Sequence, residues 1–309
     1  MKRIRIIHKT EYRYNEPVSF GPHRIMMRPR EGHDVHIVRG RLDVEPAATV
    51  RWLRDIYSNS IALLTFSQAS EKLSVVGEMD VDLHDDNPIE CLIDPNARLF
   101  PFQYAPEEQV ELIHYRLPSY PYEGVKLQYW LSDLCGPGQV VGTLELLEKL
   151  NTRIFQSFKY AHRDDPGVQL PCDTLARGSG SCRDFAVLMM EAVRSLGLAA
   201  RFVSGYLYVR PYGARKYDGG GSTHAWVQVY LPSAGWIEFD PTNGIVGTRD
   251  LVRVAVARDP RQAIPLHGFY LGSADAFLGM DVNINVVSVG DETNSTPVEV
   301  RELLNQGVP

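Results

Sequence analysis

The sequence predicts an α+β protein, with an antiparallel β-domain at the N-terminus and a domain of helices and strands after it. Three observations lead to this prediction. Short alternating runs of apolar and polar residues fill 1–85, prolines are concentrated in 86–121, and segments with helical and strand periodicity follow in 122–290. The 309 residues also suffice for about two domains of ordinary size.

The first 85 residues have the pattern of half-buried strands. Apolar and polar residues alternate in runs such as Ile4–Ile7 and Leu73–Val76, and turn-forming residues such as Glu31-Gly32 separate the runs. A period of two is typical of a strand with one buried face. We therefore expect an antiparallel β-sandwich, or a fold close to one.

Prolines mark the next segment, between Pro88 and Pro121. Because each proline fixes φ and lacks a backbone N–H, we expect an ordered connector here rather than a long helix. Beyond it, 123–134 and 141–158 have helical spacing and are expected to pack in the core. A strand is expected near 281–289, before a polar tail.

Charge and hydropathy exclude two classes of partner. The net charge is −6, so no overall basic field exists to hold a nucleic acid. No run approaches the ~20 apolar residues of a membrane span, and the N-terminus lacks the apolar run of a secretory signal. We expect a cytoplasmic protein that binds neither nucleic acid nor membrane, and the oligomeric state stays open.

The cysteines do not form a disulfide or zinc pattern. Cys91, Cys135, Cys172 and Cys182 are irregularly spaced, and no C-x-x-C pair occurs. The acidic segment Asp82-Val-His84-Asp85-Asp86 lacks the spacing of a calcium loop and is better explained as a solvated turn. We therefore expect free thiols, no metal site and no cofactor.

One of the thiols has the setting of a nucleophile. A Gly/Ser loop ends at Ser181, and an apolar stripe of helical period runs from Phe185 to Leu196. Ser181 and Asp184 fit a capping box, which places Cys182 in the first turn of a helix. Backbone N–H groups and the helix dipole favour a thiolate there, and the N–H of Cys182 is suited to hold an oxyanion. The alternative is a small buried residue under a tight turn.

A histidine that can serve as the base begins a strand. His224 opens an alternating run to Leu231, and a second strand ends at Asp240 after a turn at 232–235. Folding this hairpin brings Asp240 beside His224 within a residue or two of register, where a carboxylate orients the imidazole. Glu238 lies on the same face and is the rival. We prefer Asp240 because Pro241 holds it at the sheet's rim.

Five blocks of sequence follow one another between 180 and 244: Gly180-Ser-Cys182-Arg-Asp-Phe-Ala, Leu196–Tyr206, His224-Ala-Trp226, Gly235-Trp236 and Asp240-Pro-Thr-Asn-Gly. In residues and order they resemble the transglutaminase-like cysteine enzymes of the papain-like superfamily. The first 85 residues, with Phe20-Gly-Pro-His-Arg24 and Arg28-Pro-Arg30, resemble the β-domain of the bacterial members of that family.

The sequence patterns divide the chain, and the resemblance implies a set of catalytic residues. We expect an N-terminal β-domain at 1–85, a Pro-rich connector at 86–121, a papain-like catalytic domain at 122–290 and a polar tail at 291–309. Cys182 is the implied nucleophile, His224 the base and Asp240 the third member of the triad. The implied chemistry is acyl transfer or hydrolysis through a thioester, on a peptide or glutamine-type carboxamide, with water or a primary amine as acceptor.

The sequence leaves two other functions open, and several residues have no assigned role. A non-catalytic peptide-binding scaffold would use the same cleft, and a purely structural β-protein would leave the Gly/Ser loop without a use. The Gly-rich segment 210–222 suits either a lid or an ordinary mobile loop. Only the resemblance suggests Tyr160 as an oxyanion donor. Four aromatic residues are candidates for groove walls, although aromatic residues on strands usually belong to a core: Tyr206, Tyr208, Trp226 and Trp236.

Overall fold

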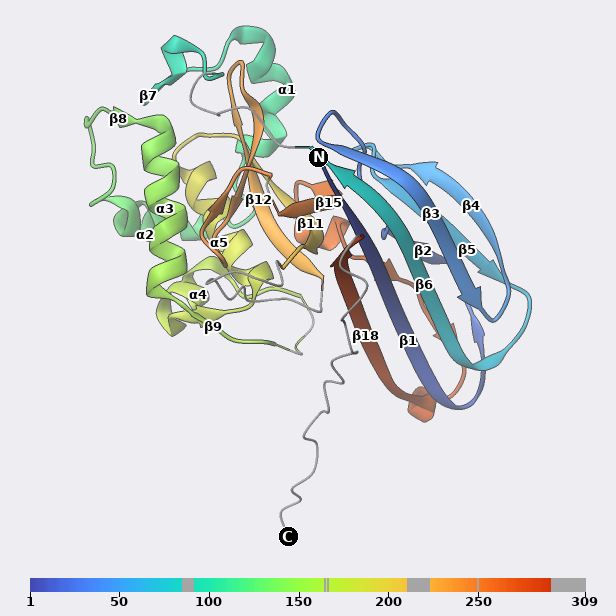
Figure 1. The fold of residues 1–309 in the computed structure, drawn as a ribbon. Helices are drawn as coiled ribbons and strands as arrows, with labels where there is room; N and C mark the ends of the chain where they lie inside the picture. Colours follow the sequence, from blue (N-terminus) through green and yellow to red (C-terminus); the bar gives the residue numbers. More distant parts are fainter. Residues whose placement is uncertain (85–91, 164, 166, 210–222, 249, 290–309) are drawn as a thin grey trace.

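The computed structural model describes residues 1–84, 92–163, 165, 167–209, 223–248 and 250–289. Two lobes lie side by side in Figure 1. The lobe of long strands, here the β lobe, contains β1–β6 and β16–β18, and the lobe with all the labelled helices, here the mixed lobe, contains α1–α5 and β7–β15. The predicted α+β class, with a sheet-rich N-terminal region, is confirmed.

The β lobe consists of two antiparallel sheets that face each other across an apolar core. The first sheet contains β17 (Tyr270–Leu271), β18 (Phe277–Ser288), β1 (Lys2–Phe20), β6 (Ser70–Leu83) and β3 (Val35–Glu45). The second contains β16 (Leu266–His267), β2 (His23–Ile25), β5 (Ser60–Phe66) and β4 (Ala48–Arg54). In β1, Ile4 and Ile6 are buried, as the period of two predicts.

The C-terminal strands lie in the β lobe, although the sequence analysis included them in the catalytic domain. β18 pairs with β1 in antiparallel register, from Ile4 opposite Ser288 to Tyr14 opposite Phe277, and the two strands are adjacent in Figure 1. β16 similarly pairs with β2. The strand expected near 281–289 therefore exists, but its partner is the beginning of the chain. Strand periodicity predicts a buried face and carries no information about the neighbouring strand.

The helices of the mixed lobe are α1 (Pro106–Arg116), α2 (Gly124–Leu131), α3 (Thr143–Ser157), α4 (Pro171–Arg177) and α5 (Cys182–Ser195). α2 and α3 occupy the two segments with predicted helical spacing. α1 lies within the segment expected to be a connector. It forms there because Pro106 occupies its first turn, where a helix needs no N–H from that residue.

A five-stranded antiparallel sheet completes the mixed lobe, in the order β14 (Ile245–Val246), β13 (Gly235–Asp240), β12 (His224–Leu231), β11 (Ala200–Leu207) and β15 (Leu251–Ala257). Short pairs join β7 (Leu99–Phe100) to β8 (Val141–Gly142) and β9 (Lys159–Tyr160) to β10 (Ser179–Gly180). α5 is buried along nearly its whole length, and it packs with the apolar residues Val227, Val229 and Leu231 of β12 in one core.

Two charged residues anchor the C-terminal half of α5. The fully buried Arg194 donates to the backbone oxygens of Ala200, Tyr115 and Arg258 and to Glu191 at 2.8 Å. Glu191 in turn accepts the backbone N–H of Ser119 at 2.8 Å. A buried charge is tolerated when it is paired and hydrogen-bonded, as both are here. These bonds fix where α5 lies, and hence where its N-terminus lies.

A buried asparagine joins the two lobes. The side chain of Asn59, in the β4–β5 turn, donates to the backbone oxygen of Val256 at 2.8 Å and accepts its N–H at 2.9 Å. It also accepts from Arg30 at 2.8 Å. Nearby, His8 Nδ1 lies 2.9 Å from the hydroxyl of Tyr206 in β11. Burial lowers the pKa of His8 to about 4, so this contact is one between neutral groups at pH 7.

Replacing Asn59 tests this junction. In Asn59→Ala the buried N–H and C=O of Val256 lose their described partner, and each unsatisfied buried group costs about 1–3 kcal/mol. We expect the free energy of unfolding, measured with urea, to fall by at least ~1 kcal/mol. Asn15→Ala, which removes one exposed bond to Asp275, should change it by less than ~0.5 kcal/mol. Equal effects of the two substitutions would contradict the assignment.

Candidate active site

Cys182 is the first residue of α5, as the sequence predicts. Ser181 precedes the helix with extended backbone, and the Asp184 carboxylate accepts both its N–H and its hydroxyl at 2.8 Å. Cys182 is buried, with 7% of its surface exposed. The thiol therefore lies in the first turn, where backbone N–H groups have no partner within the helix.

The Asp184 carboxylate is fully engaged in holding this turn. Beyond Ser181, it receives the Arg163 guanidinium at 2.8 and 3.0 Å and the backbone N–H of Gln169 at 2.7 Å. Sequence reasoning missed Arg163 and Gln169, because no local pattern links a loop residue to a helix about 20 positions later. These bonds keep the start of α5 rigid and leave Asp184 unsuited to act as a base.

The hairpin of β12 and β13 brings His224 and Asp240 together. Its register pairs Val227 with Phe239 and Gln228 with Glu238, a shift of two positions from a direct pairing of His224 with Asp240. A shift of two keeps both side chains on one face of the sheet. His224 Nε2 lies 2.8 Å from Asp240 Oδ2, and both residues are buried. The proximity that the hairpin predicted is therefore present.

Residues of the turn after β13 donate hydrogen bonds to the Asp240 carboxylate. Oδ1 accepts the backbone N–H of Thr242 at 2.9 Å, and Oδ2 accepts Asn243 Nδ2 at 2.9 Å. Burial alone would raise the pKa of Asp240, but His224, Asn243 and Thr242 lower it below its ordinary value. Sequence reasoning quoted Asp240-Pro-Thr-Asn as a motif without assigning Asn243 a role. An Asp that begins such a turn commonly accepts N–H groups from the next residues.

The sulfur of Cys182 also interacts with the imidazole of His224. Nε2 faces Asp240, whereas the buried Nδ1 has no hydrogen bond of ordinary geometry within the described part of the chain. Burial opposes the positive charge of His224, but Asp240 first and the Cys182 sulfur second more than compensate. Together they raise the pKa of His224 to about 10. The arrangement favours the charged, imidazolium form of His224.

Glu238, the rival to Asp240, faces other partners. Its carboxylate accepts Trp226 Nε1, and it also accepts Gln228 Nε2 and Arg253 Nη1, each at 2.7 Å. Arg253 also binds Asp34 of the β lobe at 2.5 Å. Glu238 therefore belongs to a buried network that connects the hairpin with the other lobe.

The aromatic residues considered as groove walls are mostly core residues. Tyr206, Tyr208 and Trp226 are each at most 3% exposed. Trp226 stacks on His224 with ring centroids 5.9 Å apart, which limits the positions open to the imidazole. Trp236 is partly exposed, and the Arg201 guanidinium lies 4.0 Å from the centre of its ring. Only Trp236 among them keeps an exposed ring surface.

Several residues that the sequence singled out lie outside the described part of the chain or contact other partners. Tyr160 pairs with Gly180 in the short β9–β10 ladder, two residues before Cys182. The segment 210–222, Cys91, and the tail from 291 lie outside the described residues, as do two members of the acidic segment, Asp85 and Asp86. Asp82, from the same segment, is bound to Arg3 at 2.7 and 2.8 Å.

The described residues contain no group of three or more His, Cys, Asp or Glu side chains that could hold a metal ion. Nor does the described part of the chain include a helix of the length and apolarity that a membrane crossing requires.

Comparison with known proteins agrees with the arrangement of the two lobes. A solved structure, a candidate cysteine protease from Cytophaga hutchinsonii, has a TM-score of 0.68 at 21% identity, with 96% of this chain and 93% of that chain covered. At this identity the likeness shows a shared fold. An uncharacterized protein of Mycobacterium tuberculosis H37Rv is 29% identical over 297 residues, 92% of each chain.

A shorter match concerns an enzyme of known name. A protein-glutamine gamma-glutamyltransferase of Pseudomonas aeruginosa is 34% identical over 73 residues, which are 23% of this chain and 11% of that protein. Family models match both parts of the chain: residues 4–82 match the bacterial transglutaminase-like N-terminal region, and residues 139–241 match the transglutaminase-like superfamily. The chain therefore belongs to the transglutaminase-like superfamily, in the form that carries a bacterial transglutaminase-like N-terminal region.

Proposed function

We propose that the protein is a cysteine-dependent acyl-transfer enzyme that acts on peptide or glutamine-type carboxamide bonds. One observation carries the proposal. The buried imidazole of His224 is hydrogen-bonded to Asp240, and it also interacts with the sulfur of Cys182, which lies at a helix N-terminus and helps to raise the pKa of His224. Family membership supports the class of reaction. The short match to a protein-glutamine gamma-glutamyltransferase supports a glutamine carboxamide as substrate.

In the first half of the proposed reaction, the Cys182 thiolate attacks the carbonyl carbon of the substrate. The backbone N–H of Cys182 stabilises the resulting oxyanion. The C–N bond then breaks, and the imidazolium of His224 donates its proton to the departing amine or ammonia. A thioester between Cys182 and the acyl group remains, with His224 neutral.

In the second half, a water molecule or a primary amine attacks the thioester. Neutral His224 accepts a proton from this acceptor, the C–S bond breaks, and the thiolate–imidazolium pair is restored. Asp240 orients the imidazole throughout and stabilises its charged form, and Asn243 holds Asp240 in place. Water as acceptor gives a hydrolase, and an amine gives a transglutaminase; a peptide or protein is the substrate in both cases.

Alkylation distinguishes this enzyme from a non-catalytic scaffold. At pH 7, iodoacetamide should label Cys182 faster than Cys135 and Cys172, because Cys182 interacts with the imidazole of His224, whereas burial raises the pKa of the other two thiols. His224→Gln should remove the advantage of Cys182, whereas His114→Gln, at an exposed histidine on α1, should not. Labelling is read by mass spectrometry of each cysteine peptide. Uniformly slow labelling of all the cysteines would favour the scaffold.

The raised pKa of His224 predicts a pH-dependent stability. Because the folded-state pKa, about 10, exceeds the ordinary 6.5, protonation of His224 stabilises the folded chain. The contribution is complete below pH 6.5 and is lost as pH rises toward 10. We expect the free energy of unfolding, measured with urea, to decline more steeply between pH 6.5 and 10 in the parent chain than in His224→Gln. Parallel pH profiles would show that His224 is not stabilised as an imidazolium.

A glutamine peptide tests the reaction directly. Incubation with this peptide and a fluorescent primary amine should release ammonia, and either the amine-linked peptide or the glutamate peptide should appear in mass spectra. Cys182→Ala should abolish both products, and His224→Gln should lower their rate by roughly 10²-fold or more, the contribution of a general acid–base group. Cys172→Ala, at a thiol outside the site, should leave the rate unchanged. Turnover that survives Cys182→Ala would refute the proposal.

A further inference from the structure

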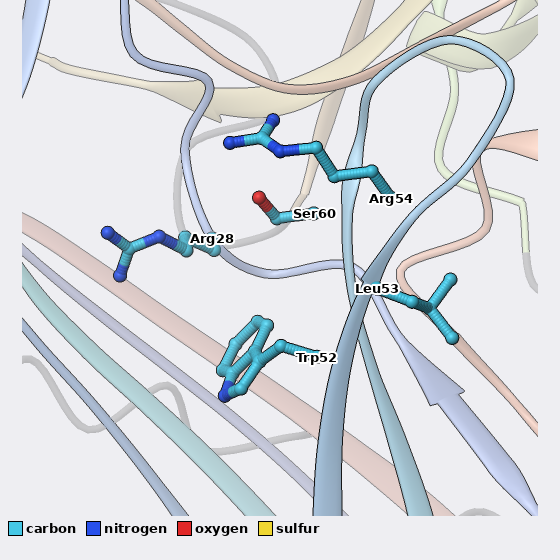
Figure 2. A pocket seen from close by; sticks show the side chains of 5 residues that line it. All are labelled: Arg28, Trp52, Leu53, Arg54 and Ser60. Carbon is cyan, nitrogen blue, oxygen red and sulfur yellow. The ribbon is translucent and has the colours of Figure 1, made fainter.

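A cavity in the β lobe is lined by residues unlike those of the candidate active site. Its volume is about 500 Å³. The residues that line it are Arg28, Trp52, Leu53, Arg54 and Ser60 (Figure 2). This volume lies within the range of small-molecule sites. All five residues lie in the β lobe, whereas Cys182 begins α5 in the mixed lobe, and neither Cys182, His224 nor Asp240 lines the cavity.

The cavity lies at an open end of the β-sandwich. In the β4–β5 ladder Arg54 pairs with Ser60 and Trp52 pairs with Ala62, so these side chains share one face of the sheet. Ala62 is completely buried in the sandwich core, yet Trp52 on the same face is 54% exposed. Figure 2 shows Leu53 turned away from the other four side chains. The inward face of β4 is therefore left uncovered.

The opposite sheet leaves room for one of the arginines. Gly40 lies within β3, where glycine weakens a strand and provides no side chain to pack. A Cβ at Gly40 would lie only 3.1 Å from Nη1 of Arg28. The missing side chain thus allows the Arg28 guanidinium to lie against β3 at the edge of the cavity.

The positive charge of the cavity is only weakly compensated. Arg28 pairs with Glu31 at 3.5 Å, and both side chains are more than a third exposed, so the ion pair is screened by water. Arg54 donates to the backbone oxygen of Ser58 at 2.9 Å, which uses one N–H and leaves the charge in place. Asp55, next in the chain, accepts the backbone N–H groups of Tyr57 and Asn59. None of the lining residues is acidic.

We propose that this cavity binds a small anionic molecule that carries a planar ring. The forked N–H groups of Arg28 and Arg54 match a carboxylate or a phosphate, both of which accept paired hydrogen bonds. The indole of Trp52 offers an exposed flat surface for the ring, and the Ser60 hydroxyl adds a further donor. The site is independent of the triad and of the proposed acyl transfer.

Fluorine NMR titration of the full chain tests the site with defined probes. The probes are para-fluorobenzoate, para-fluorophenyl phosphate and the neutral para-fluorobenzamide. At least one anion should bind saturably and about tenfold or more tighter than the amide, and the better anion identifies the head group. If neither anion binds more tightly than the amide, the proposal is wrong.

Variants locate the binding. Arg54→Gln and Arg28→Gln should each weaken anion binding about tenfold or more. Arg51→Gln is the matched control, because Arg51 lies on the other face of β4, and it should leave binding unchanged. Thermal unfolding confirms that each variant is folded. An Arg51→Gln variant that weakens binding as much as Arg54→Gln would indicate non-specific attraction and overturn the proposal.

Discussion

The hydrogen bond between Asp240 and His224 determines the charge state of the site. Burial by itself would discharge both groups, since each is almost completely removed from water. Together they remain charged, because the carboxylate lies 2.8 Å from the ring and is itself held by Thr242 and Asn243. The turn after β13 therefore matters as much to the imidazole as its direct partner does. Thr242 holds the carboxylate through Oδ1, and Asn243 donates to Oδ2, the same oxygen that faces His224.

The position of Cys182 depends on the contacts that hold α5 in place. α5 is held near both ends by charge pairs, the partly buried Asp184–Arg163 pair at the N-terminus and the buried Glu191–Arg194 pair toward the C-terminus. The apolar residues between them form part of one continuous core with β12. A helix fixed in this way has little freedom to move Cys182 relative to the hairpin. Rigid placement of reacting groups is the main contribution that a scaffold makes to a covalent mechanism.

The β lobe takes part in this support. Asn59 binds the edge of β15 through its side chain, and Asp34 reaches Arg253, which binds Glu238 beneath the hairpin. Asp34 and Glu238 raise the pKa of Arg253, against the effect of burial, so it stays charged. β18 pairs with β1, so the strand that follows the catalytic part of the chain belongs to the same sheet as the N-terminal strand. The N-terminal region is thus physically coupled to the strands that carry His224 and Asp240, and it also contains the cationic cavity.

Local patterns in the sequence were enough to predict the α+β class, the start of α5 at Cys182 and the hairpin that joins His224 to Asp240. Each of these depends on residues close together in the chain, whose periodicity and turn chemistry act directly on the backbone. The tertiary structure alone decided that β18 pairs with β1, that Arg163 holds Asp184, and that the sandwich opens beside Trp52. Those features join residues far apart in sequence, and such contacts form only when packing brings strands and loops together, so no local pattern encodes them.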